Sequence, residues 1–151
     1  MRTIVRAVFA LTVAALSCAT FGQTSSESKR RNVTLEEASD LVYAYLESGG
    51  CTKNSCSVDR IHDADWPAFY SFQAMWPNPY GSPNLGYFKV DPRTGDVWNG
   101  VICGGFTSPS LVKLQQAIRK RIGLSDEEYR KTPKNAPMCE QGQKPGLVRG
   151  K

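Results

Sequence analysis

The sequence predicts an α+β fold, in which an N-terminal helix packs on an antiparallel sheet of about four strands and a second helix lies near the C-terminus. Apolar residues recur at helical spacing after Thr34 and again after Ser108. Between these two segments, apolar and polar residues alternate in short runs separated by Gly and Pro, a pattern typical of strands. The chain has 151 residues, which is room for one domain of ordinary size.

The N-terminal 22 residues predict a secretory signal peptide. Arg2 and Arg6 precede an unbroken apolar run at residues 7–16, and small residues follow it. The run is about half as long as a membrane-spanning helix, so we expect no membrane span. A signal peptide implies a periplasmic or secreted protein.

The cleavage site is open at this point, because small residues allow cutting after Ala19 or after Gly22. Cys18 also leaves open a lipid anchor, as in bacterial lipoproteins, although Leu16 stands two residues before it rather than three. Residues 23–31 are uniformly polar and predict a flexible leader.

The remaining chain divides into a domain at 32–132 and a Pro-, Gly- and Lys-rich tail at 133–151, which we expect to be extended and tethered at Cys139. The net charge of +5 falls to about +3 without Arg2 and Arg6. So small a charge, spread along the chain, gives no reason to expect nucleic acid as a partner.

The first helix begins after Thr34, which with Glu37 forms a capping box, and ends at Gly49-Gly50. A second helix has Ser108 as its N-cap and ends at Gly123. Further capping residues predict one or two helical turns from Ser125 to the residues before Pro133.

Four segments predict strands, and a Pro-rich loop at 77–84 interrupts them, because proline cannot continue a ladder of hydrogen bonds. The predicted strands are residues 57–62, 68–76, 86–90 and 97–102.

The sequence between the last two strands, Asp91 to Asp96, is explained by turn geometry. Pro92 fixes the φ angle of the second turn position, and Gly95 accepts the positive φ that closes the turn. A calcium loop would need further carboxylates at alternating positions. We therefore expect a hairpin turn rather than a metal site.

Four cysteines remain after removal of the signal peptide, and an even number in an exported chain predicts two disulfides. Three pairings are possible; we favour Cys51–Cys56, which closes a tight loop, and by elimination Cys103–Cys139. Zinc is the alternative, but the spacing does not match two CxxC pairs and the compartment is oxidising. We expect no metal and no cofactor.

The helix opening TLEEA and the later segment GYFKVDPRTGDVW resemble the PepSY-type domain, and more broadly small cystatin-like α+β folds, over residues 33–102. This resemblance implies a helix packed across an antiparallel sheet. Such domains are mostly non-catalytic, and many bind or inhibit proteases or other secreted enzymes. The loop between Cys51 and Cys56, the Pro-rich loop and the helix from Pro109 depart from the minimal PepSY unit.

His62 is the one histidine of the chain, and Asp63 and Asp65 follow it closely. A histidine paired with a carboxylate can serve as a general acid or base, so a small periplasmic hydrolase is the alternative function. The sequence offers no partner nucleophile in a Gly-x-Ser-x-Gly elbow. We favour a polar turn here and expect no catalytic residue.

Aromatic residues are the candidates for binding. Trp76, Tyr80, Tyr87 and Trp98 lie around the Pro-rich loop and the hairpin, where rigid rings can anchor a protein interface. These residues favour a non-catalytic domain that binds an envelope or secreted hydrolase, as an inhibitor or immunity protein does. The sequence does not indicate the oligomeric state.

Overall fold

The structure is a computed structural model that describes residues 32–77, 81, 83–134 and 136–150. The predicted signal peptide at 1–22, the leader at 23–31 and Tyr80 lie outside the described residues. Within them, no helix combines the length and the apolar character that a membrane crossing requires.

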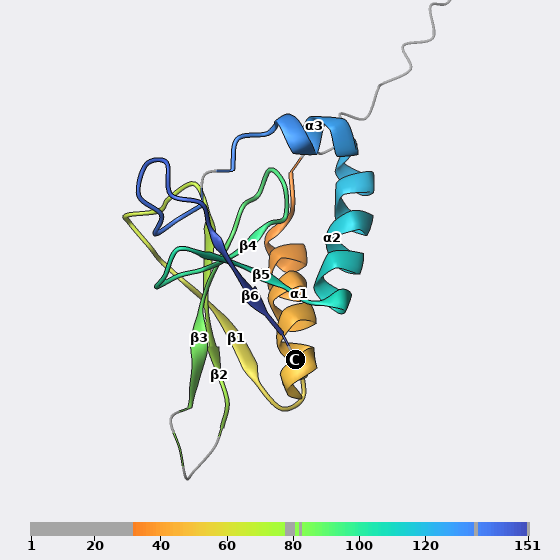
Figure 1. Cartoon of the computed structure of the whole chain (residues 1–151). Coiled ribbons are helices and arrows are strands. Elements are labelled where there is room, and N and C mark those ends of the chain that lie inside the picture. The colour runs from red at the N-terminus through yellow and green to blue at the C-terminus, as the bar shows by residue number, and fades with distance from the viewer. Residues whose placement is uncertain (1–31, 78–80, 82, 135, 151) are drawn as a thin grey trace, which may run out of the picture.

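The described residues form one six-stranded mixed sheet, whose strands neighbour one another in chain order. Helices α1 and α2 lie side by side over one face of the sheet, and α3 lies at the far end of α2 (Figure 1). The elements are α1 (Leu35–Leu46), the 3-10 turn η1 (Glu47–Gly49), β1 (Ser57–Ile61), β2 (Tyr70–Met75), β3 (Asn84–Val90), β4 (Val97–Asn99), β5 (Gly104–Thr107), α2 (Pro109–Ile122), α3 (Asp126–Lys131) and β6 (Gly146–Arg149).

The predicted α+β class is confirmed, but the sheet has six strands rather than about four, and it is not wholly antiparallel. Strands β1 to β5 pair antiparallel with their neighbours, whereas β6 pairs in parallel with β5. The two additional strands are short and rich in glycine, and β6 lies in the segment that we predicted to be an extended tail.

Helix α1 begins as predicted. The Thr34 hydroxyl accepts the Glu37 N–H at 3.2 Å, and the Glu37 carboxylate accepts the Thr34 N–H at 2.8 Å. Its buried face packs on the core side of β2 and β3, where Phe72 and Phe88 are almost fully buried. The core therefore lies between the sheet and the two long helices.

The turn between β3 and β4 has the geometry expected from its sequence. Gly95 has φ 73°, and its N–H donates to the Asp91 carbonyl at 2.8 Å. Helix α2 docks on this turn, because Gln115 Nε2 donates to the Gly95 carbonyl at 2.9 Å. The hairpin is thus a support for the second helix.

Both favoured disulfides are present. Cys51 and Cys56 join across 5.6 Å between Cα atoms and close the loop that leads from η1 to β1. Cys103 and Cys139 join across 4.5 Å and tie the C-terminal segment to the start of β5. Strand β6 begins three residues after a turn at 140–143 and pairs with β5, so the tail has a second attachment in addition to Cys139.

Candidate functional site

The four aromatic candidates for binding lie in different environments. Trp76 and Tyr87 are 38% and 36% exposed and can contact another molecule. Trp98 is only 6% exposed and packs over β5, where a Cβ at Gly105 would lie 3.3 Å from the indole ring. Trp98 is therefore not the surface anchor that we predicted, because its ring is buried against the sheet. Tyr80 lies outside the described residues.

Exposed apolar side chains gather beside Tyr87, at the loop between β4 and β5. Val101 and Ile102 are 64% and 55% exposed, and Met138 is 40% exposed. Gly100 joins this loop to β3, because its N–H donates to the Tyr87 carbonyl at 2.8 Å. The disulfide brings the segment of Met138 beside that of Ile102. We call these four residues, Tyr87, Val101, Ile102 and Met138, the apolar patch.

The strand predicted at 97–102 ends early, which places the patch residues in a loop. The Asn99 side-chain oxygen accepts the N–H groups of Val101 and Ile102 at 2.8 and 3.0 Å, so the chain turns away from the sheet. Val101 and Ile102 were not among the predicted binding residues, which were all aromatic. The dipeptide Asn99-Gly100 is a turn signal in the sequence and indicates a loop at these two residues.

A buried lysine lies on the face of the sheet opposite the helices. Lys89 on β3 is 3% exposed along its side chain and forms an ion pair with Asp63, in the loop between β1 and β2. Its ammonium lies 5.8 Å from the centre of the Trp66 ring. The hydrogen bond from Lys89 lowers the pKa of Asp63 below its ordinary value.

This ion pair bears on the alternative reading of His62 as a catalytic base. The carboxylate of Asp63 is engaged by Lys89 and also accepts the Asp65 N–H at 3.1 Å, as expected of a polar turn. His62 itself is exposed. In the part of the chain that the structure describes, no three metal-ligating side chains gather at one place.

A second charged cluster joins the hairpin turn to α2 and α3. Asp96 accepts hydrogen bonds from Arg119 at 2.9 Å and from the Tyr129 hydroxyl at 2.7 Å, and Lys134 lies 3.4 Å away. The Tyr129 ring is contacted by both cations, at 3.6 Å from Arg119 and 3.7 Å from Lys134. Burial, and then the charge of Asp96, raises the pKa of Tyr129.

A cleft of about 380 Å³ opens between this cluster and β6. Its walls come from β4 to β6, from one side of α2, from Tyr129 of α3 and from Lys134 after that helix. Trp98, Phe106, Val112 and Leu147 supply apolar surface, and Arg119 and Lys134 supply positive charge at one end. The cleft is thus suited to a ligand that combines an apolar part with a negative charge.

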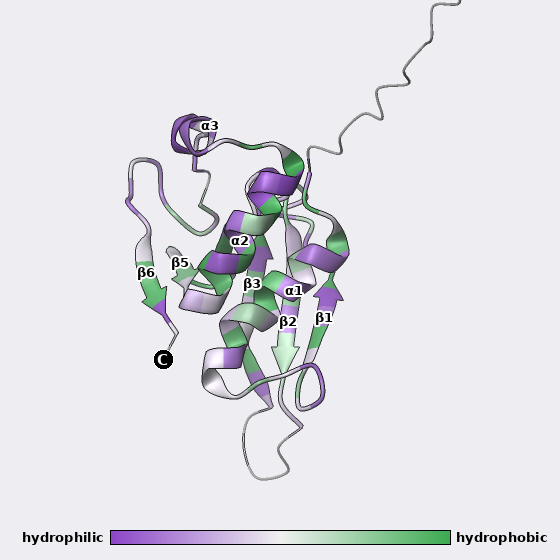
Figure 2. Ribbon diagram, turned by 90° about the vertical axis from the view of Figure 1, so that its right-hand side faces the viewer, coloured by the Kyte–Doolittle hydropathy of each residue, from purple (hydrophilic) through white to green (hydrophobic). Residues whose placement is uncertain are grey.

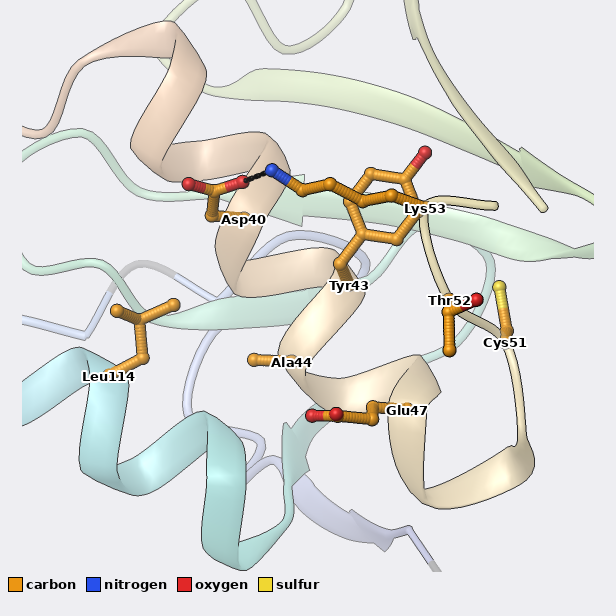
Figure 3. A pocket seen from close by; sticks show the side chains of 8 residues that line it. All are labelled: Asp40, Tyr43, Ala44, Glu47, Cys51, Thr52, Lys53 and Leu114. Carbon is orange, nitrogen blue, oxygen red and sulfur yellow. Dashed lines mark ion pairs between the residues drawn. The ribbon is translucent and has the colours of Figure 1, made fainter. Parts of the chain in front are cut away.

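A hollow of about 320 Å³ lies between α1 and the loop closed by the first disulfide (Figure 3). Asp40 and Lys53 form an ion pair of 2.5 Å across it, beside the ring of Tyr43. The hydrogen bond with Asp40 raises the pKa of Lys53. Asp40 and Lys53, which could otherwise hold a charged ligand, are already paired with each other, so this hollow is a weaker candidate than the cleft and the patch.

Comparison with protein-family models found no match, and none of the curated proteins matches the chain. The fold is similar to a chain in a solved structure described as a type VI secretion system effector–immunity complex from Pseudomonas protegens. The two chains share 22% sequence identity and superpose with a TM-score of 0.53, over 68% of this chain and 88% of the other.

At this level of identity the likeness shows a shared fold. The resemblance to PepSY-type and cystatin-like domains remains a prediction, since no family model matches.

Proposed function

We propose that this chain is an exported, non-catalytic binding domain that inhibits a secreted or envelope enzyme, as inhibitor and immunity proteins do. The apolar patch carries the proposal. Two adjacent aliphatic side chains, Val101 and Ile102, are more than half exposed on a loop. Exposed apolar residues grouped on neighbouring segments are typical of protein interfaces rather than of open surface.

The patch is held in a defined conformation, which favours binding because little ordering is needed when a partner arrives. Asn99 fixes the backbone of Val101 and Ile102 through two hydrogen bonds. The bond between Cys103 and Cys139 holds the loop against the segment of Met138. Two disulfides also suit an oxidising compartment, such as the periplasm or the exterior.

The comparison supports the same reading. A fold like this one occurs in a complex between an effector and an immunity protein. The proposed partner here is an enzyme of the envelope or a secreted enzyme, and the proposed role is to block it by contact through the patch. Trp76, which is 38% exposed at the end of β2, would extend the contact surface.

The test is capture of the partner with matched variants. The protein, purified from an oxidising compartment, is immobilised and exposed to periplasmic and secreted fractions. Ile102→Asp places a charge in the patch, and Leu35→Asp makes the same change at a 37% exposed position on α1. We expect one stoichiometric enzyme on the wild type and on Leu35→Asp, bound about thirtyfold more weakly by Ile102→Asp.

Inhibition is then measured on the captured enzyme with a substrate of its own class. Addition of wild-type protein should lower its turnover, and addition of Ile102→Asp at the same concentration should not. Circular dichroism of each variant checks that the fold is intact. Retention of no enzyme, or equal retention by both variants, would refute the proposal.

A further inference from the structure

We propose that the open edge of β6 is a docking site for an acidic, extended segment of the partner protein, which pairs with β6 and adds a strand to the sheet. This inference rests on the proposed function for its partner and names the surface and the chemistry that hold that partner. Figure 2 shows β6 at one border of the sheet, with β5 on its inner side.

Among the described residues, no strand pairs with the outer side of β6. The N–H groups of Gly146 and Gly150 donate toward β5, to the carbonyls of Cys103 and Thr107. Successive residues of a strand direct their backbone groups to opposite sides. Leu147 and Arg149 therefore direct their N–H and C=O groups to the open edge, where an extended chain can pair with them.

The side chains at this edge also suit a partner. Leu147 is 70% exposed, more than any other large apolar residue that the structure describes, and lines the cleft. A strand paired with β6 would cover Leu147 and bring its own side chains over the cleft walls formed by Val112 and Trp98. Apolar surface of both chains would be removed from water in this way.

Charge decides which kind of segment fits. Residues 104–151 contain ten basic and four acidic residues, a net charge of +6, whereas residues 32–103 contain four basic and nine acidic residues, a net charge of −5. The basic segment, residues 104–151, contains β6. Arg149 is the last residue of β6 and Lys144 precedes the strand; both are exposed, and Lys134 and Arg119 line the cleft. Asp96 is the one acidic residue of the cleft lining, and it is already paired with Arg119.

The same charges argue against a second copy of this chain on the edge. In an antiparallel pair of β6 strands, Lys144 and Arg149 of one copy would face the basic ends of the other. Like charges placed across a strand pair are destabilising. An acidic strand gains from the same four cations, and the attraction speeds association at low salt.

The probe is an end-capped synthetic peptide of alternating Glu and Val, with a Lys-and-Val peptide and a single-stranded oligonucleotide of equal charge as comparisons. Fluorescence anisotropy gives the Kd, and amide chemical shifts locate the site. We expect the acidic peptide to bind, with the largest shifts at Leu147 and Arg149, and the Lys peptide not to bind.

Leu147→Pro removes the N–H that points to the open edge and leaves the hydrogen bonds to β5 intact. Proline is tolerated at such a position of an edge strand. It should weaken binding of the acidic peptide roughly tenfold. Leu147→Val keeps the N–H and should bind like the wild type. Arg149→Glu should weaken binding about three- to tenfold at low salt, and Arg60→Glu, the same change on the exposed opposite edge strand β1, should not.

Equal binding of both peptides, stronger binding of the oligonucleotide, shifts confined to β1, or a dimer of this chain that Leu147→Pro dissociates would each overturn the inference. The proposed function fails separately. If Ile102→Asp fails to capture the partner but Leu147→Pro still captures it, the proposed function holds and this docking site is refuted. If the acidic peptide binds at β6 but no enzyme is captured, the docking site holds and the proposed function is refuted.

Discussion

Replacing Asp63 by Asn is expected to destabilise the protein strongly, because it leaves the buried ammonium of Lys89 without its carboxylate. The Lys89 side chain is 3% exposed and that of Asp63 is 23% exposed. Removing one member of a buried ion pair costs about 3–5 kcal/mol. Since water reaches part of Asp63, we expect a loss of about 2–3 kcal/mol in the free energy of unfolding.

Lys89→Met is the matched control, because Met is of similar length and leaves the carboxylate free to contact water. Its cost should not exceed about 1 kcal/mol, and the double variant should be more stable than Asp63→Asn alone. Urea unfolding followed by tryptophan fluorescence measures all four proteins. The reasoning is refuted if Asp63→Asn lies within about 0.5 kcal/mol of the wild type, or if Lys89→Met costs as much as Asp63→Asn.

The pH dependence of stability tests the same pair. The hydrogen bond from Lys89 holds the pKa of Asp63 below the value of about 3.9 expected in the unfolded chain. A carboxyl group with a lowered pKa stabilises the folded state above its unfolded pKa. The difference in stability between wild type and Asp63→Asn should therefore be complete above about pH 5 and shrink as the pH falls through 4 and below.

Two further predictions concern the patch and the Asp96 cluster. Gly100→Ala places a Cβ 2.8 Å from the Tyr87 Cβ and should cost about 1–3 kcal/mol, whereas Gly49→Ala, with no atom within 4 Å, should change the unfolding midpoint little. Tyr129→Phe removes the hydrogen bond to Asp96 and should cost about 1 kcal/mol. Because the pKa of Tyr129 is raised, the stability advantage of the wild type over this variant should hold below about pH 10 and fall as the pH rises further, which unfolding curves against pH would show. An advantage that persists above the phenol titration seen by ultraviolet absorbance would contradict this.

Local signals in the sequence were sufficient for the helices and the hairpin. Thr34, Ser108 and Ser125 each cap the helix that they were expected to begin, because a side-chain oxygen that accepts an N–H two or three residues ahead acts within one turn. The turn at Gly95 and both disulfides also match the predictions. The caps, the turn and the first disulfide each depend on residues that are close in sequence. The second disulfide was predicted by elimination, once the first pair was assigned.

Strands β5 and β6 could not be predicted in the same way, because they depend on contacts between distant segments. Gly104 has no strand propensity of its own, but a Cβ there would lie 3.2 Å from a Val148 side-chain carbon, so glycine permits the approach of β6. The cleft and the β6 edge were missed for that reason. The burial of Trp98 likewise follows from β5 lying beneath its ring.

The placement of β6 has a consequence for the order of folding. Strands β1 to β5 pair each with the next one in the chain, so these contacts can form while later residues are still being synthesised. The parallel strand β6 must wait for α2 and α3 to complete the crossover from β5. The edge of the sheet that we assign to the partner therefore forms last. An incompletely folded chain would expose the edge of β5 instead. Protection of the Val148 N–H from hydrogen exchange should accordingly appear late in folding.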